Sequence, residues 1–98
     1  MNLESERVTE EVEKALSSLG KLRILKLLMK RPDHVFTRYE IKKKTSLSPS
    51  DIKSNFKILV EIGWVKEFKF QHIQKYCINL DNKLVKDFSE FFRRIWYI

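Results

Sequence analysis

The segment that decides the fold is Leu47–Val65, which reads LSPSDIKSNFKILVEIGWV. Ser48 can cap a helix because its hydroxyl accepts a hydrogen bond from a free amide of the first turn. Pro49 follows at the position where a helix tolerates proline best, and Asp51 completes an S-x-x-D start. Gly63 is a natural left-handed stop. The segment therefore predicts a capped helix that begins at Pro49 and ends just before Gly63.

The two sides of this helix differ in chemistry. Large apolar residues recur at helical spacing and predict a buried stripe, which comprises Ile52, Phe56 and Leu59. Small polar residues and lysines fall on the other side, namely Ser50, Lys53, Ser54 and Lys57. Few roles need a short capped helix with one apolar face and one face of serine and lysine. Insertion into a groove of DNA is one of them.

The chain before this helix is predicted to be mostly helical. Hydrophobic periodicity and turn residues predict, in order, a helix over about 3–19, a helix over about 21–31, a very short extended piece at 35–36 and a helix over about 37–45. Pro32 ends the second helix. Thr37 and Glu40 form a capping box that opens the third. Ser46 and Leu47 then make the turn into the next helix.

After that helix the hydrophobic period changes from 3.6 to 2. Two alternating runs, 64–70 and 76–80, are joined by the segment 71–75 and predict a β-hairpin. Asp81 or Asn82 then caps a last helix that runs to the C-terminus. The order of elements is that of a winged helix-turn-helix. We predict a mainly α (α+β) fold in one domain, with a two-stranded wing and extra N- and C-terminal helices.

The residues between about 20 and 80 also resemble the ArsR/MarR-like winged-helix transcriptional regulators. The matching positions are the Leu47–Ser48 turn, the helix residues Ile52, Phe56, Lys57, Ile58 and Leu59, the closing Gly63–Trp64–Val65, the Glu40–Ile41 pair and the second wing strand at 76–80. The resemblance implies a DNA-binding regulator of prokaryotic or archaeal type. It also implies that the first two turns of the helix 49–62, the recognition helix, face the major groove.

Three features depart from the family pattern. Lys42 stands where the family has a small residue, and Thr45 stands where it has leucine. The helix over 37–45 and the recognition helix are therefore expected to cross less closely than in the family. The predicted wing tip has neither glycine nor arginine, which argues against reading of the minor groove. In addition to these three departures, the cysteine motif that is specific to the metal-sensing members is absent, because the matching helix reads YEIKK at 39–43.

The net charge of +7 is unevenly distributed along the chain. Residues 1–14 carry five acids and two bases, whereas residues 21–57 carry eleven bases and three acids. This basic block covers the recognition helix and the helices before it, which is the footprint expected for a polyanionic partner. The alternative is a solvated, lysine-rich surface.

Candidate DNA contacts fall into three groups. On the recognition helix they are Pro49, Ser50, Lys53, Ser54 and Lys57. On the preceding helix, Arg38, Lys42, Lys43 and Lys44 are expected to neutralise phosphates, which fixes position without reading sequence. On the hairpin the candidates are Lys69 and Lys75. Apart from Asn55, no side chain in the first two turns can make a planar bidentate contact to a base, so modest sequence selectivity is expected.

Other classes of function find no support in the sequence. A single cysteine, Cys77, excludes an intramolecular disulfide and a cysteine-rich zinc site, and we expect no metal or cofactor. No glycine-rich phosphate loop, nucleophile elbow or paired carboxylates indicate an enzyme. No signal peptide and no run near the roughly 18 apolar residues of a membrane span are present. We therefore expect a soluble, cytoplasmic protein without membrane contact.

The last predicted helix is more apolar than packing on a small winged helix requires. Together with the first helix, it predicts a two-fold interface between two copies of the chain over 1–19 and 82–98. The candidate interface residues are Val8, Val12, Leu16, Leu84, Phe88, Phe91, Phe92, Ile95 and Trp96. The alternative is a last helix that folds fully onto its own domain.

These features predict a homodimeric transcriptional regulator that binds double-stranded DNA sequence-selectively through the helix 49–62. Two alternatives share the same fold. One is a winged helix that contacts protein within a transcription or chromatin assembly. The other is an architectural protein that binds DNA without sequence preference.

Overall fold

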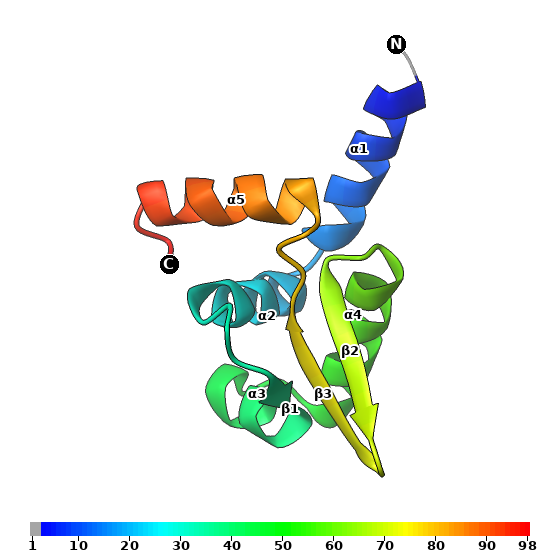
Figure 1. The fold of residues 1–98 in the computed structure, drawn as a ribbon, viewed down its shortest axis with the longest axis vertical. Coiled ribbons are helices and arrows are strands. Elements are labelled where there is room, and N and C mark those ends of the chain that lie inside the picture. Colours follow the sequence, from blue (N-terminus) through cyan, green and yellow to red (C-terminus); the bar gives the residue numbers. More distant parts are fainter. Residues whose placement is uncertain (1–2) are drawn as a thin grey trace.

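The computed structural model describes residues 3–98, with side chains from Ser5 onward, and the order of its elements confirms the predicted fold class. The helices are α1 (Leu3–Ala15), α2 (Leu19–Lys30), α3 (Arg38–Thr45), α4 (Pro49–Glu61) and α5 (Lys83–Arg94), and the strands are β1 (Phe36–Thr37), β2 (Val65–Phe70) and β3 (Ile73–Ile78). In Figure 1, α2, α3, α4 and the sheet form one body, and α1 and α5 lie at its upper end. None of the helices in residues 3–98 is long and apolar enough to cross a membrane.

The sheet has three strands rather than the two predicted for the wing. All neighbours are antiparallel, in the order β1-β3-β2. Phe36 pairs with Tyr76 and Thr37 pairs with Lys75, so the short extended piece before α3 joins the hairpin. An extended backbone needs partners for its amides and carbonyls, and β3 offers a free edge for them. This pairing ties the start of α3 to the wing.

The hairpin is also tighter than predicted. Only Gln71 and His72 separate the strands, and Gln71 has a left-handed backbone with φ of 56°. The segment predicted as a five-residue loop mostly belongs to β3, because Ile73 pairs with Phe70 across the turn. Gln71–His72 carries none of the glycine or asparagine signals that mark a two-residue turn in sequence.

Helix boundaries differ from prediction where tertiary contacts decide them. α1 ends at Ala15 and not at Leu19, and Ser18 caps α2 by accepting a hydrogen bond from the Lys21 amide at 3.1 Å. Gly20, which falls between the two predicted helices, lies in the first turn of α2. A Cβ there would lie 2.5 Å from the side-chain Nδ2 of Asn55 in α4, so glycine leaves room for this side chain between α2 and α4. At the other end, α5 stops at Arg94 instead of continuing to the C-terminus.

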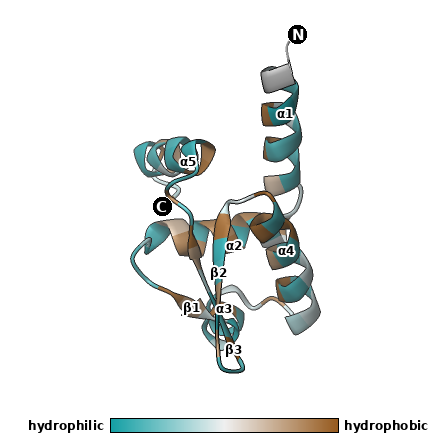
Figure 2. Cartoon of the chain, turned by 45° about the vertical axis from the view of Figure 1, so that its right-hand side comes forward, coloured by the Kyte–Doolittle hydropathy of each residue, from teal (hydrophilic) through white to brown (hydrophobic). Residues whose placement is uncertain are grey.

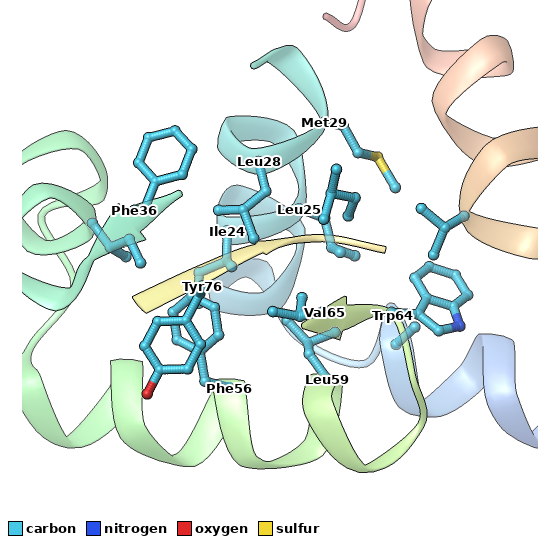
Figure 3. Close-up of a cluster of buried hydrophobic side chains, with 14 of the residues drawn as sticks. Ile24, Leu25, Leu28, Met29, Phe36, Phe56, Leu59, Trp64, Val65 and Tyr76 are labelled. Carbon is cyan, nitrogen blue, oxygen red and sulfur yellow. The ribbon is translucent and has the colours of Figure 1, made fainter. Parts of the chain in front are cut away.

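The core lies between α2, α4 and the sheet (Figure 3). The predicted stripe of α4 is confirmed, since its three apolar residues are at most 1% exposed: Ile52, Phe56 and Leu59. The Phe56 ring stacks on the Tyr76 ring of β3, with centroids 4.1 Å apart. Packing of this kind fixes α4 on the domain and turns its serine and lysine side outward.

A polar cluster joins the terminal helices to the start of the wing. Trp64 is fully buried, and its Nε1–H donates to Glu11 Oε1 of α1 at 2.6 Å. The same carboxylate oxygen accepts from Asn82 Nδ2 at 3.1 Å. Asn82 in turn caps α5, because its Oδ1 accepts from the amides of Leu84 and Val85. The carboxylate of Glu11 therefore holds α1 and α5 against the end of α4.

Candidate nucleic-acid interface

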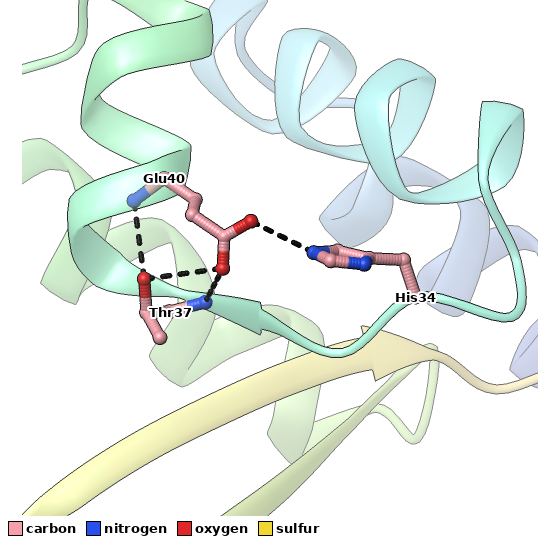
Figure 4. A network of polar contacts seen from close by, with 3 residues as sticks. All are labelled: His34, Thr37 and Glu40. Carbon is pink, nitrogen blue, oxygen red and sulfur yellow. Dashed lines mark hydrogen bonds and ion pairs between the residues drawn. The ribbon is translucent and has the colours of Figure 1, made fainter.

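The start of α3 is held by a hydrogen-bonded cluster (Figure 4). Thr37 Oγ1 accepts from the Glu40 amide at 3.2 Å, and the Thr37 amide donates to Glu40 Oε1 at 3.1 Å. Glu40 Oε2 lies 2.7 Å from His34 Nε2. The pKa of Glu40 is lowered, first by the Thr37 amide and second by His34. The predicted capping box is confirmed, and it fixes Arg38 as the first residue of α3.

The turn between α3 and α4 explains one departure from the family pattern. Thr45 is buried, its hydroxyl donates to the Ile41 carbonyl at 2.6 Å, and the same oxygen accepts from the Leu47 amide at 3.3 Å. A leucine at this position would leave that turn amide without its partner. Ser46 takes the left-handed conformation with φ of 61°, and Ser48 caps α4 through the Asp51 amide at 3.2 Å.

The outward side of α4 carries the predicted contact residues. All five are exposed: Pro49, Ser50, Lys53, Ser54 and Lys57. Two serines are already engaged, since Ser50 Oγ lies 3.2 Å from Ser48 Oγ and Ser54 Oγ donates to the Asp51 carbonyl. Asn55 is turned away, because its Oδ1 accepts from Ser18 Oγ at 3.5 Å on the α2 side. The lysines are therefore the main candidate ligand-binding groups of this face.

Arg38 is positioned by the core. Its Nε–H donates to Tyr76 Oη at 3.1 Å, and the Tyr76 ring is the one that stacks on Phe56. Burial raises the pKa of Tyr76, and the nearby guanidinium opposes that shift. One shallow hollow brings the cations of α3 and α4 together; it is lined by Arg38, Lys53, Phe56, Lys57, Val60, Glu61, Glu67 and Tyr76. The two glutamates at its rim partly offset the three positive charges.

The three consecutive lysines of α3 do not share one surface. Successive helical residues point about 100° apart. Lys42 faces α4, where it lines a hollow with Arg38, Tyr39, Pro49 and Ile52. Lys44 lines a different hollow with α2. Lys43 is exposed and follows Lys42 around the helix. The structure therefore brings Lys42 to the recognition helix but places Lys44 elsewhere.

The two hairpin lysines also point in opposite directions. Lys69 pairs with Gln74, on the same sheet face as Tyr76 and α4, whereas Lys75 pairs with Phe68 on the outer face. Lys66 is bound to Asp81 at 3.1 Å. Of the hairpin candidates, Lys69 therefore lies on the side of the recognition helix.

Sequence reasoning missed three exposed apolar side chains on α3 and at the wing tip. Tyr39 is 74% exposed at the start of α3, and Phe70 and Ile73 face each other at the wing tip. The signal for Tyr39 was its place next to Arg38 at the helix start. For Phe70 and Ile73 the correct strand register was needed.

Among residues 3–98, no group of three or more histidine, cysteine or acidic side chains could hold a metal ion, and burial raises the pKa of the Cys77 thiol.

Comparison with known proteins supports the fold. The sequence matches no family model and no curated protein. Among solved structures, HlyU from Vibrio cholerae N16961 superimposes with a TM-score of 0.81 and 22% identity over 100% of both chains. The fold is a winged helix-turn-helix. The transcriptional repressor BigR from Xylella fastidiosa shares this winged helix. It superimposes with a TM-score of 0.74 and 17% identity, over 97% of this chain and 96% of that chain. An ArsR family transcriptional regulator, RHA00566, also shares it, with a TM-score of 0.68 and 15% identity over 99% of this chain and 97% of that chain. The resemblance predicted from sequence is confirmed at the level of fold.

Proposed function

We propose that the protein is a homodimeric transcriptional regulator that binds double-stranded DNA with α4 in the major groove. The observation that carries this proposal is the convergence of Arg38, Lys53 and Lys57 on the outward side of α3 and α4. In a winged helix this side carries the recognition helix. Cations at this density attract the phosphate backbone. A regulator of this kind would act on genomic DNA in the cytoplasm.

Modest sequence selectivity follows from the chemistry of α4. Lysine makes point-charge contacts, and no arginine, glutamine or outward asparagine offers a bidentate contact to a base. Phosphate contacts then supply most of the binding free energy. This feature also favours a second candidate, an architectural protein that binds DNA without sequence preference. The ratio of specific to non-specific affinity separates the two candidates.

The dimer would form through α1 and α5. In Figures 1 and 2 these helices stand at the opposite end of the molecule from α3 and the hairpin tip. Most of the candidate residues are half-buried or exposed: Val8, Val12, Leu16, Leu84, Phe88, Phe91, Ile95 and Trp96. Phe92 is 8% exposed and packs in the protomer's own core, so it would support the interface residues from below and make little direct contact with a partner. Two-fold pairing here leaves both α4 helices free to reach successive major grooves, about 34 Å apart.

The test is a titration of duplex DNA at several salt concentrations. Lys53→Ala with Lys57→Ala should weaken binding and lower the salt slope by about 0.9 for each phosphate that each protomer no longer neutralises. The matched control is Lys83→Ala with Lys86→Ala, which removes the same charge from exposed positions of α5. An equal effect of both pairs would mean that α4 has no special role. If the wild type binds no duplex at low salt, the winged helix serves a protein contact instead.

A further inference from the structure

A second basic hollow lies between α2 and α3, away from the outward side of α4. It is lined by Arg23, Lys26, Leu27, Lys30, Lys44 and Thr45. Four of these six residues are cations, and all four are exposed. The α2 residues stand at 23, 26, 27 and 30, a spacing that places them on one face of the helix. We refer to this hollow as the α2–α3 groove.

Within the described residues, the positive charges of the α2–α3 groove have no acidic partners. None of the ion pairs among residues 3–98 involves its four cations. α2 contains no acidic residue, and the one acid of α3, Glu40, is bound to Thr37 and His34. Asp33 lies in the neighbouring hollow, which Lys30 also lines. Like charges that are held together without counter-charges favour the binding of an anion.

The cations continue around α3 from one hollow to the other. Lys42 lies with Arg38 beside the start of α4, Lys43 is exposed, and Lys44 lies in the α2–α3 groove. The belt thus extends from the recognition helix to the side of the domain. A duplex seated on α4 extends beyond the domain in both directions. Its backbone is the anion that such a belt can follow, since one strand offers a phosphate at every nucleotide.

We propose that the α2–α3 groove binds backbone phosphates of the DNA that flanks the segment contacted by α4. This inference rests on the proposed function and assigns a second site on the same ligand. Contacts at this site read no base sequence, because only phosphate and sugar face the groove. They increase the length of duplex that the protein covers, and they add to the salt dependence of binding.

The experiment compares two duplex lengths with two matched variants. One duplex spans only the segment under the α4 helices, and the other extends it by about one helical turn, roughly 10 base pairs, on each side. Lys26→Gln with Lys30→Gln removes two charges from the groove. Lys83→Gln with Lys86→Gln removes the same charge from α5. Affinity is measured between about 50 and 200 mM salt, and circular dichroism checks the fold of each variant.

The groove variant should lose affinity only on the longer duplex. Each phosphate that the variant fails to neutralise should lower the salt slope by about 0.9, so the ratio of variant to wild-type affinity should change about 3.5-fold per phosphate over this fourfold range of salt. Lys83 and Lys86 are not among the candidate interface residues of α5, and sedimentation velocity checks that the α5 variant keeps the oligomeric state of the wild type. This variant should then match the wild type on both duplexes. An equal loss of affinity on the short duplex, or no loss on the long one, would overturn the inference. Failure of the wild type to bind either duplex would instead overturn the proposed function.

Discussion

Arg38 is an exposed cation whose direction is set by a buried side chain. Its Nε–H donates to Tyr76 Oη, and the Tyr76 ring is fixed by its stack on Phe56. The Tyr76 phenol is neutral near pH 7, and burial raises its pKa further, so its oxygen is an acceptor that carries no charge. The core of the domain therefore controls one of the candidate phosphate contacts directly.

Replacing Tyr76 with phenylalanine tests this link. Tyr76→Phe keeps the ring stack but removes the acceptor for Arg38. Since a net hydrogen bond is worth about 0.5–1.5 kcal/mol, DNA affinity should fall about two- to tenfold with little change in melting temperature. Tyr97→Phe also removes a phenol hydroxyl, but it keeps the ring that faces Lys26 and so should leave DNA affinity unchanged. A large loss of stability in Tyr76→Phe would assign the hydroxyl to the fold instead.

Phe56 is one of the three buried apolar residues that hold α4 on the domain. It is 1% exposed and contacts the Tyr76 ring. Phe56→Ala should reduce the free energy of unfolding by about 3–5 kcal/mol, because the lost transfer energy and the remaining cavity add. Its neighbour Lys57 is exposed, and Lys57→Ala should change stability by no more than about 0.5 kcal/mol. Urea denaturation measures the change in the free energy of unfolding for both variants. Equal losses of stability would contradict the assigned faces of α4.

Among the elements, α3 depends on a pH-sensitive cap. The pKa of Glu40 lies below its ordinary value of 4.5 because the carboxylate accepts from the Thr37 amide and contacts His34. Because this pKa is lowered on folding, the ionised Glu40 carboxylate stabilises the folded state at pH values above the pKa that it has in the unfolded chain. It is lost as pH falls through the lower, folded value.

Glu40→Gln should therefore be less stable than the wild type at pH 7, and the difference should shrink as pH falls below the ordinary carboxyl pKa of 4.5 and through the lowered pKa of Glu40. Urea denaturation at a series of pH values gives this difference directly. Thr9→Ala changes an exposed hydroxyl of α1 and serves as a control for general acid effects. If the free energies of unfolding of Glu40→Gln and the wild type differed by the same amount down to about pH 3, the carboxylate charge would not stabilise the cap.

Elements were predictable from sequence where their signals are local. Ser48, Thr37 and Asn82 each cap a helix through amides two or three residues ahead. Ser48 and Thr37 were identified from pattern alone, whereas the pattern left the last cap open between Asp81 and Asn82. The boundary between α1 and α2 was not, because Ser18 and Gly20 are placed by contact with Asn55 of α4. Such contacts join residues far apart in the chain and have no periodic signal.

The candidate site was predictable only in part for the same reason. The exposed face of α4 follows from helical spacing, so its lysines were found. Lys42 and Lys44 were treated as one surface, but the packing of α3 between α2 and α4 sends them to different hollows. The role of Tyr76 was missed because Arg38 lies 38 residues away and meets it only through the β1–β3 pairing.

At the scale of the whole molecule, the prediction concerns assembly. Phe91 and Ile95 are both exposed on the end of α5, with 42% and 51% of their surfaces accessible. Phe91→Ser with Ile95→Ser should give a folded monomer that loses most of its DNA affinity, because one protomer reaches only one half-site. Sedimentation velocity measures the mass. A wild type that remains monomeric at tens of micromolar would exclude the dimer and leave α5 as part of a single domain.

The two tryptophans have opposite surroundings. Trp64 is fully buried with its indole N–H bonded to Glu11, whereas Trp96 is 91% exposed just beyond α5. Dissolved iodide should therefore quench the fluorescence of Trp96 and leave that of Trp64 almost unchanged. Emission from Trp64 then reports on whether the chain is folded, and the quenching of Trp96 reports on whether the end of α5 is covered. The protein carries separate optical probes for its folding and for the covering of the end of α5, without any added label.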